Sequence, residues 1–164
     1  MTKPAERAGQ GSAHLSPSAG LDDGVRAMAV MTAIDTRQYR QELIVRPKDL
    51  GCIRRIVGAH LRHWGHGKLV RPASMCVTEL LSNVHKHAGS AACTLLLQSS
   101  PTGVRIVVSD RCRDLPVIRE PDWSAESGRG LFLISKTVDA WGASPNPGGK
   151  DVWVEFCAVR ETVA

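Results

Sequence analysis

The stretch Val77-Thr-Glu-Leu-Leu-Ser-Asn-Val-His-Lys-His-Ala88 is the part of the chain that decides its fold. At about 100° per residue, Glu79, Asn83 and His87 fall on one helical stripe roughly 80° wide. A separate apolar stripe on the adjoining face predicts the side that packs on a core. It consists of Val77, Leu80, Leu81, Val84 and Ala88. The polar stripe therefore lies at the edge of a core-facing helix, where a pocket can open.

The side chains of the polar stripe suit a site for Mg²⁺ and phosphate. Mg²⁺ prefers hard oxygen donors and usually shares its coordination shell with water and phosphates. A carboxylate, an amide and an imidazole on one rigid element supply such donors and a general base. The same pattern is also found on an ordinary amphipathic helix with polar residues on its flank. Features elsewhere in the chain are needed to choose between these two interpretations.

Length and composition favour one domain with a tail, since the chain has 164 residues, 43% of them hydrophobic and 4% aromatic. No apolar run approaches the roughly 20 residues that span a membrane. The N-terminus shows no apolar segment typical of a signal peptide. Five cysteines without a Cys-x-x-Cys pair argue against a disulfide framework or a zinc knuckle, and they favour a reducing cytoplasm.

The chain is basic, with a formal net charge of +5 and a pI near 9.2. Such a balance suits nucleic acid or an acidic partner. The Lys and Arg residues are scattered along the sequence, however, and a local cluster is seen only at Arg111, Arg113, Arg119 and Arg129. A solvated basic surface is the favoured interpretation, and direct nucleic-acid binding is not expected.

The order of predicted elements indicates an α+β fold. Residues 1–35 mix small, polar and charged residues without periodicity and predict a weakly ordered tail, so the domain is placed at residues 36–160. Strands are predicted at 39–45, 91–98, 104–109 and 151–159, with a short strand from 141 and a turn at 145–149, and helices at 50–64, 72–87 and 131–140. We therefore expect a two-layer α/β sandwich, in which helices cover one face of a mixed, mostly antiparallel sheet.

Two further features lie after predicted strands or before a predicted helix. Asp110 follows the strand 104–109, and its carboxylate is suited to accept a hydrogen bond from an exocyclic amine such as that of adenine; a turn-initiating Asp is the alternative. Ser127-Gly-Arg-Gly-Leu131 is a glycine-rich turn that leads into a helix. Backbone N–H groups and a helix N-terminus favour phosphate there, and a flexible loop is the alternative.

A third feature is Lys150, which follows Pro147-Gly-Gly before the last predicted strand. Its side chain either reaches a phosphate or is a solvated lysine in a hairpin turn. Three histidines, His60, His63 and His66, recur every third residue at the end of the helix 50–64. This spacing is compatible with a metal site, but a polar helix end is favoured because cationic side chains suit the C-terminal dipole.

In this order, the motifs resemble those of the Bergerat-fold (GHKL) ATPases, the superfamily of histidine kinases, DNA gyrase and mismatch-repair proteins. The chain is most similar to their small stand-alone branch, the anti-sigma-factor serine/threonine kinases and their actinobacterial relatives. The resemblance covers about residues 41–156. It is carried by the stretch Val77 to Ala88, by Val107-Val-Ser-Asp110 with Leu115-Pro116, by Gly128-Arg-Gly-Leu-Phe-Leu-Ile134 and by Gly149-Lys-Asp-Val-Trp153.

The resemblance implies ATP and Mg²⁺ as cofactors and a role for each matching residue. Glu79 is the implied general base, which takes a proton from a serine hydroxyl or from water, and Asn83 holds Mg²⁺ through its side-chain oxygen. Asp110 reads the adenine amine, and His87 flanks the phosphates or a lid formed by residues 111–127. The implied cofactor-binding residues of the glycine-rich turn and the last strand are Gly128, Arg129, Gly130, Leu131 and Lys150.

Two positions depart from the superfamily pattern. Cys112 stands where the superfamily has the glycine of Asp-x-Gly, so a Cβ crowds the adenine or requires another turn. Asp151 stands where a Thr is common, and an acid close to the phosphates repels them. Both departures favour weaker ATP binding and turnover.

The resemblance implies a regulator of the anti-sigma type, which binds a sigma factor and phosphorylates a serine or threonine on an antagonist protein. Such a regulator is a cytoplasmic protein kinase, and the sequence leaves open whether it forms a homodimer. The two departures keep a second hypothesis open, namely a non-catalytic protein-binding regulator with a weak or vestigial nucleotide site. A nucleic-acid binder rests on the pI alone.

Overall fold

The computed structural model describes residues 37–122, 124 and 128–158, all of them within one compact unit that runs from Asp35 to Ala164. The predicted tail, residues 1–35, lies outside the described residues, as do residues 123 and 125–127 of the predicted lid. Within the described part of the chain, no helix is both long enough and apolar enough to cross a bilayer.

Five strands form one sheet in the order β1-β2-β3-β5-β4. Their bounds are Arg37–Ile44 for β1, Ala92–Ser100 for β2, Gly103–Asp110 for β3, Ala140–Asn146 for β4 and Gly149–Cys157 for β5. All four neighbouring pairs are antiparallel, so the sheet is antiparallel throughout rather than mixed. The predicted hairpin of β2 and β3 is present, and its strands are joined by Pro101 and Thr102.

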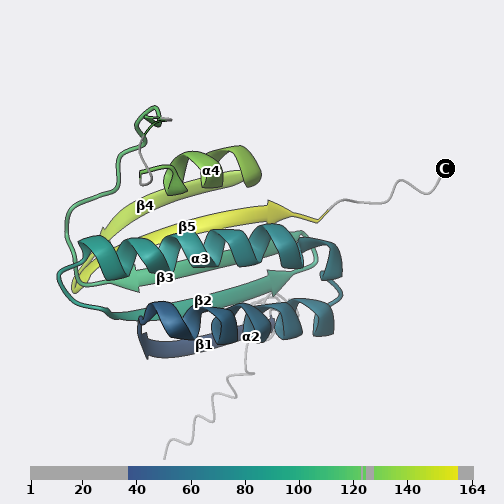
Figure 1. The fold of residues 1–164 in the computed structure, drawn as a ribbon. Helices are drawn as coiled ribbons and strands as arrows, with labels where there is room; N and C mark the ends of the chain where they lie inside the picture. Colours follow the sequence, from purple (N-terminus) through teal and green to yellow (C-terminus); the bar gives the residue numbers. More distant parts are fainter. Residues whose placement is uncertain (1–36, 123, 125–127, 159–164) are drawn as a thin grey trace, which may run out of the picture. The chain divides into compact units, whose positions relative to one another are not determined.

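Three α-helices lie side by side against one face of this sheet (Figure 1). They are α2 at Leu50–His63, α3 at Val70–His87 and α4 at Gly130–Thr137, with the short 3-10 turns η1 at Pro47–Asp49 and η2 at Gly67–Leu69. The core lies between the two layers, where apolar side chains of α2 and α3 meet every second residue of the strands. The predicted α+β sandwich is thus confirmed.

The largest differences from prediction lie near the C-terminus of the domain. The helix expected at 131–140 ends at Thr137, because Val138 is extended and the backbone N–H of Asp139 donates to Glu155 on β5. The chain therefore enters β4 at Ala140, one residue earlier than the strand predicted from 141, and β4 continues to Asn146, into the turn predicted at 145–149. Pro145 lies within β4, where it is tolerated because β4 is an edge strand.

Candidate functional site

Helix α3 presents the predicted polar stripe beside the core. Its apolar stripe is buried from Val77 to Val84 and half-buried at Ala88, while Glu79 and Asn83 are half-buried and His87 is exposed. Thr78 lies next to Glu79 and donates its hydroxyl back to the carbonyl of Ser74 at 2.8 Å, so it adds no free donor to the stripe. The predicted separation of an apolar face and a polar shoulder is what the helix shows.

A cavity of about 1070 Å³ opens where α3 faces the end of β3, the start of β5 and the start of α4. All nine site residues that the resemblance implies line this one cavity. They are Glu79, Asn83, His87, Asp110, Gly128, Arg129, Gly130, Leu131 and Lys150. Residues separated by up to about seventy positions in the chain are therefore brought together on the helix side of the sheet, although their individual roles remain predictions.

Asp110 and Lys150 form a buried ion pair at the floor of the cavity. The antiparallel register places them opposite each other on β3 and β5. The Lys150 ammonium donates to Asp110 Oδ1 at 3.0 Å and to the carbonyl of Cys112 at 3.3 Å. The same Oδ1 accepts the backbone N–H of Cys112 at 2.8 Å. The carboxylate is thereby held by two donors, and the turn after β3 closes on it.

The alternative of a solvated Lys150 is wrong, since the side chain is buried and paired with Asp110, while its contact with a phosphate stays a prediction. The reason is that β5 begins at Gly149, two residues earlier than the predicted strand. Side chains alternate along a strand, so Lys150 falls on the same face as the buried Val152 and points to the helices. Because the predicted strand began two residues too late, Lys150 was assigned to a turn and its burial was not predicted.

Asp151 lies on the opposite face of the sheet from the cavity. It is half-buried, pairs across the strands with Ser109 and Ser144, and accepts a hydrogen bond from the Asn146 side chain at 2.7 Å. The expectation that it repels phosphates is therefore wrong, because the sheet separates its carboxylate from the cavity. Cys112, the other departure, does line the cavity and is half-buried.

The start of α4 packs directly against Glu79. A Cβ built on Gly130 would collide with the Glu79 carboxylate, so a larger residue at this position would require the end of the Glu79 side chain to move aside. Gly128 has a φ of +91°, a left-handed conformation that favours glycine. Glycine suits these two positions for different reasons. At Gly130 the reason is the close approach of Glu79, and at Gly128 it is the backbone angle.

Several cavity residues were not predicted as site residues from the sequence. Lys86, Arg119 and Asp114 line the cavity together with the nine predicted residues. Lys86 is three positions after Asn83 on α3, so helical spacing was a usable signal for it. Arg119 and Asp114 lie in the irregular connection after β3, where no periodicity indicates which side chains turn inward.

Two buried thiols near the site, those of Cys76 and Cys93, stay protonated. Burial raises the pKa of Cys76 on α3 to about 12, and the nearby Glu79 carboxylate adds to this rise. Burial likewise raises the pKa of Cys93 to about 11, with a further contribution from Asp110. Because the thiolate is the reactive form, neither cysteine is suited to act as a nucleophile here.

The three regularly spaced histidines do not gather around a common point. His60 stacks on Tyr39 with ring centroids 4.2 Å apart, and His66 Nε2 lies 2.8 Å from Ser99 Oγ. Among the described residues no group of three or more His, Cys, Asp or Glu is arranged to hold a metal ion. Burial and the charge of Arg37 lower the pKa of His66, which favours its neutral form.

The chemistry of the cavity fits a magnesium nucleotide. The Glu79 carboxylate and the Asn83 amide are hard oxygen donors of the kind that Mg²⁺ binds. Lys86, Arg119 and Arg129 supply positive charge around them. The close contact between Gly130 and Glu79 brings the backbone of a helix N-terminus to the same point, and such a terminus favours anions.

Comparison with known protein families agrees with this geometry. The family described as the histidine kinase-like ATPase domain matches residues 44–156, which is most of the chain. The chain therefore belongs to this family and is an ATP-binding domain. A comparison with curated proteins finds no match.

Proposed function

We propose that this member of the histidine kinase-like ATPase family is an ATP-dependent regulatory protein of the anti-sigma type, which phosphorylates a serine or threonine on an antagonist protein. The observation that carries the proposal is the single cavity, in which Glu79, Asn83 and Asp110 lie with the Gly128–Gly130 turn. The motif phrases quoted above support the small regulatory branch of the family, with a sigma factor and its antagonist as partners in the cytoplasm.

In this proposal Glu79 is the general base of the transfer. Its carboxylate takes the proton of the acceptor hydroxyl as the hydroxyl oxygen forms a bond to the γ-phosphorus. The bond from that phosphorus to the β,γ-bridging oxygen breaks, and its electron pair leaves with ADP. When bound, Mg-ATP supplies the phosphoryl group and neutralises the developing charge. The half-buried position of Glu79 beside Gly130 keeps its carboxylate at the start of α4.

The other residues bind and orient the nucleotide. The Asn83 side-chain oxygen is the ligand proposed for Mg²⁺, and His87 flanks the phosphates. Arg129 and the backbone of Gly128 and Gly130 face the phosphates at the start of α4. Asp110 reads the adenine amine through Oδ2, since Oδ1 already accepts from Lys150 and Cys112.

A second candidate function is a non-catalytic protein-binding regulator. The observation that favours it is the Asp110–Lys150 pair, because a carboxylate engaged by a buried ammonium is a poorer acceptor for the adenine amine. Asp151 no longer supports this alternative. The two candidates differ in whether Mg-ATP binds tightly and whether it is turned over.

Thermal unfolding with and without Mg-ATP tests the nucleotide site. Ligand at about 100 times its dissociation constant stabilises the native state by about 2.7 kcal/mol. We expect a Mg-dependent rise in the melting temperature, which Asn83→Ala abolishes and the matched control Asn146→Ala, outside the cavity, retains. No rise at millimolar ATP would reject the ATP-dependent function and leave the non-catalytic candidate.

Turnover is tested with Glu79→Gln, which keeps the size of the side chain beside Gly130 but removes the base. We expect ATP turnover to fall by roughly 10²- to 10⁴-fold, the usual contribution of a general base. The thermal shift with Mg-ATP should persist, and Glu42→Gln, an exposed control on β1, should leave both quantities unchanged. Unaltered turnover in Glu79→Gln would show that another group is the base.

A further inference from the structure

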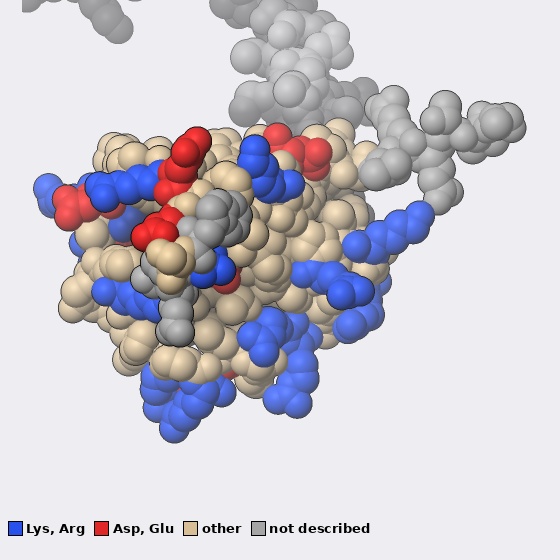
Figure 2. All heavy atoms as spheres, turned by 45° about the horizontal axis from the view of Figure 1, so that its top comes forward, with Lys and Arg blue, Asp and Glu red and all other residues tan. Residues whose placement is uncertain are grey.

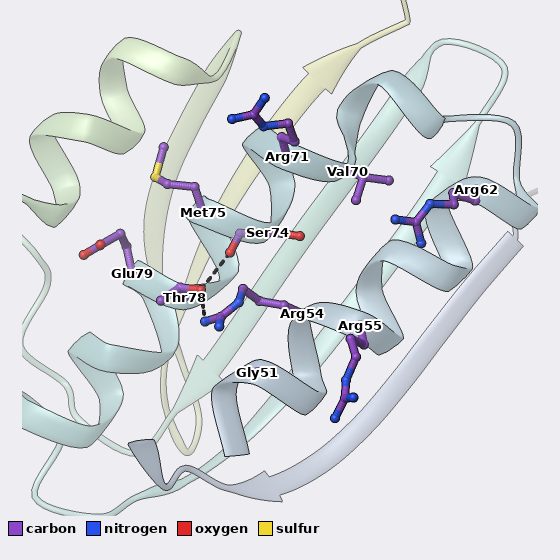
Figure 3. Close-up of a pocket in the computed structure, with 10 residues that line it drawn as sticks. All are labelled: Gly51, Arg54, Arg55, Arg62, Val70, Arg71, Ser74, Met75, Thr78 and Glu79. Atoms are coloured by element: carbon purple, nitrogen blue, oxygen red, sulfur yellow. Dashed lines mark hydrogen bonds between the residues drawn. The ribbon is translucent and has the colours of Figure 1, made fainter. Parts of the chain in front are cut away.

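A second, shallower pocket of about 910 Å³ lies between α2 and the first half of α3. Gly51, Arg54, Arg55 and Arg62 of α2 line one side of this pocket, which we name the arginine groove (Figure 3). Val70, Arg71, Ser74, Met75, Thr78 and Glu79 of α3 line the other side. The two helices are held close beneath it, because Gly58 is buried with room for little more than its hydrogen beside Val70.

The basic residues that are scattered in sequence are gathered in space at this groove. From Leu50 to Thr78 the chain contains no Asp or Glu, but it contains Arg54, Arg55, Arg62, Lys68 and Arg71. Figure 2 shows Lys and Arg side chains concentrated in the lower and right-hand parts of the view, with few acidic side chains between them. The basic side chains of this face are exposed, as expected of a solvated basic surface, and they are unevenly distributed over the molecule.

The guanidinium groups of the groove have no carboxylate partner among the described residues. Arg54, Arg55, Arg62 and Arg71 are exposed, and the ion pairs of the described chain involve other basic residues. Arg54 makes a long hydrogen bond to the Thr78 hydroxyl at 3.4 Å, which draws it across the groove toward α3 (Figure 3). Uncompensated charge of one sign in a groove attracts and orients a partner of the opposite sign.

Glu79 connects the arginine groove to the nucleotide cavity. It lines both pockets, and it is the acidic residue of the groove in the described chain. Figure 3 shows Glu79 and Met75 pointing from α3 toward α4, away from Arg54. A polypeptide that lies along the groove therefore ends beside the proposed base, at the edge of the cavity that binds the nucleotide.

We propose that the arginine groove docks an acidic segment of a protein partner and places a serine or threonine of that segment next to Glu79. This inference rests on the proposed function, for which it names the class of substrate. Acidic residues of the segment contact Arg54, Arg62 and Arg71, and its hydroxyl residue lies at the Glu79 end. The groove carries no aromatic side chain, whereas binding of single-stranded nucleic acid generally relies on aromatic stacking.

Peptide binding tests the groove directly. The probe is a short fluorescein-labelled peptide with a central serine flanked by aspartates and glutamates, and its neutral counterpart carries asparagines and glutamines. Binding to the full chain is measured by fluorescence anisotropy at several salt concentrations. We expect the acidic peptide to bind and the neutral one not to, and we expect affinity to fall as salt rises.

The matched variants compare the groove with the opposite face of the sheet. Arg54→Glu with Arg71→Glu should weaken binding of the acidic peptide by about tenfold or more, since each exposed ion pair contributes up to about 1 kcal/mol and 1.4 kcal/mol is tenfold. Arg40→Glu with Arg105→Glu makes the same change in net charge outside the groove and should leave binding unchanged. If the reversed variant does not fold, Arg54→Gln with Arg71→Gln replaces it.

Three results would overturn the proposal: equal binding of the neutral peptide, an equal loss in the control variant, or displacement of the peptide by a DNA oligonucleotide at lower concentration. The Mg-ATP thermal shift is measured on the same variants to separate this proposal from the function on which it rests. Groove-dependent peptide binding without any Mg-ATP shift would support the docking surface and reject the kinase. If Mg-ATP shifts the melting temperature but peptide binding does not depend on the arginines, the docking proposal is rejected and the proposed kinase function is retained.

Discussion

Two ion pairs join β3 to β5, one on each face of the sheet, and they have the same separation of 3.0 Å. Lys150 and Asp110 lie at the cavity with side chains 9% and 5% exposed. Arg105 and Glu155 lie on the open face with side chains 43% and 39% exposed. Both are partners in the register of the same two strands. Their difference is therefore one of surroundings and not of geometry.

The comparison shows that the same ion-pair geometry contributes differently to stability on the two faces of the sheet. Water can solvate either partner of the exposed pair in place of the other, so that pair contributes little to the free energy of unfolding. Neither partner of the buried pair can be solvated in place, so each depends on the other. The buried pair lies at the floor of the large cavity, while the open face carries Trp153 with Arg105 stacked 4.6 Å from its ring centroid.

The largest expected effect is from Lys150→Met, which leaves the Asp110 carboxylate buried without its cation. We expect the free energy of unfolding to fall by about 3–5 kcal/mol. Urea unfolding followed by circular dichroism measures it. The double variant Lys150→Met with Asp110→Leu should recover a large part of this loss. If Lys150→Met lowers the free energy of unfolding by less than removal of the exposed Arg105–Glu155 pair does, burial does not distinguish the two pairs.

The next largest effect is expected on the open face, from Gly142→Ala. A Cβ at Gly142 would lie 2.5 Å from the Trp153 ring, so the indole must move off the strand and its stacking with Arg105 changes. Overpacking of this kind costs about 1–3 kcal/mol. Urea unfolding and tryptophan fluorescence report the two consequences, and Gly67→Ala, which has open space around its Cβ, is the control.

A smaller effect is expected from Arg105→Ala, which removes the exposed ion pair. The pair and the cation–π contact together should contribute no more than about 1 kcal/mol, and less at high salt. The measurement is urea unfolding at low and high salt beside Lys150→Met. A salt-independent loss as large as that of Lys150→Met would contradict the distinction between the two faces.

The smallest expected effect is a pH dependence of the free energy of unfolding that arises from His66. Its neutral imidazole contacts Ser99 on the helix side of the sheet. Its lowered pKa means that the unfolded chain binds the proton more tightly, so stability contributed here is present above the ordinary histidine pKa of 6.5 and is lost as pH falls below it. Ser99, its partner at 2.8 Å, is buried. The difference in unfolding free energy across this window should be smaller in His66→Gln than in the wild type, and an equal difference would exclude His66 as its source.

Local patterns predicted the elements that rely on neighbouring residues. The periodicity of α3, the alternation in β2 and β3 and the glycine-rich start of α4 each depend on residues a few positions apart. The end of α4 was less predictable. The hydroxyls of Ser135 and Thr137 donate hydrogen bonds to backbone carbonyls one turn earlier, as in a continuing helix. Val138 nevertheless leaves the helix, because the backbone N–H of Asp139 donates to Glu155 on β5.

The sequence by itself determined the α+β class and the polar stripe Glu79–Asn83–His87, because helical and strand periods are local properties. The set of residues that lines the cavity was predicted from the order of the motifs and the family that they resemble. Only the tertiary structure decided that Lys150 is buried against Asp110 and that Asp151 faces away from the cavity that Asp110 and Lys150 line. It alone also decided that the arginines of α2 and α3 share one groove. The physical reason is that strand register and helix packing set which face a charge occupies and which opposite charges lie within reach, and a shift of one residue along a strand reverses the face.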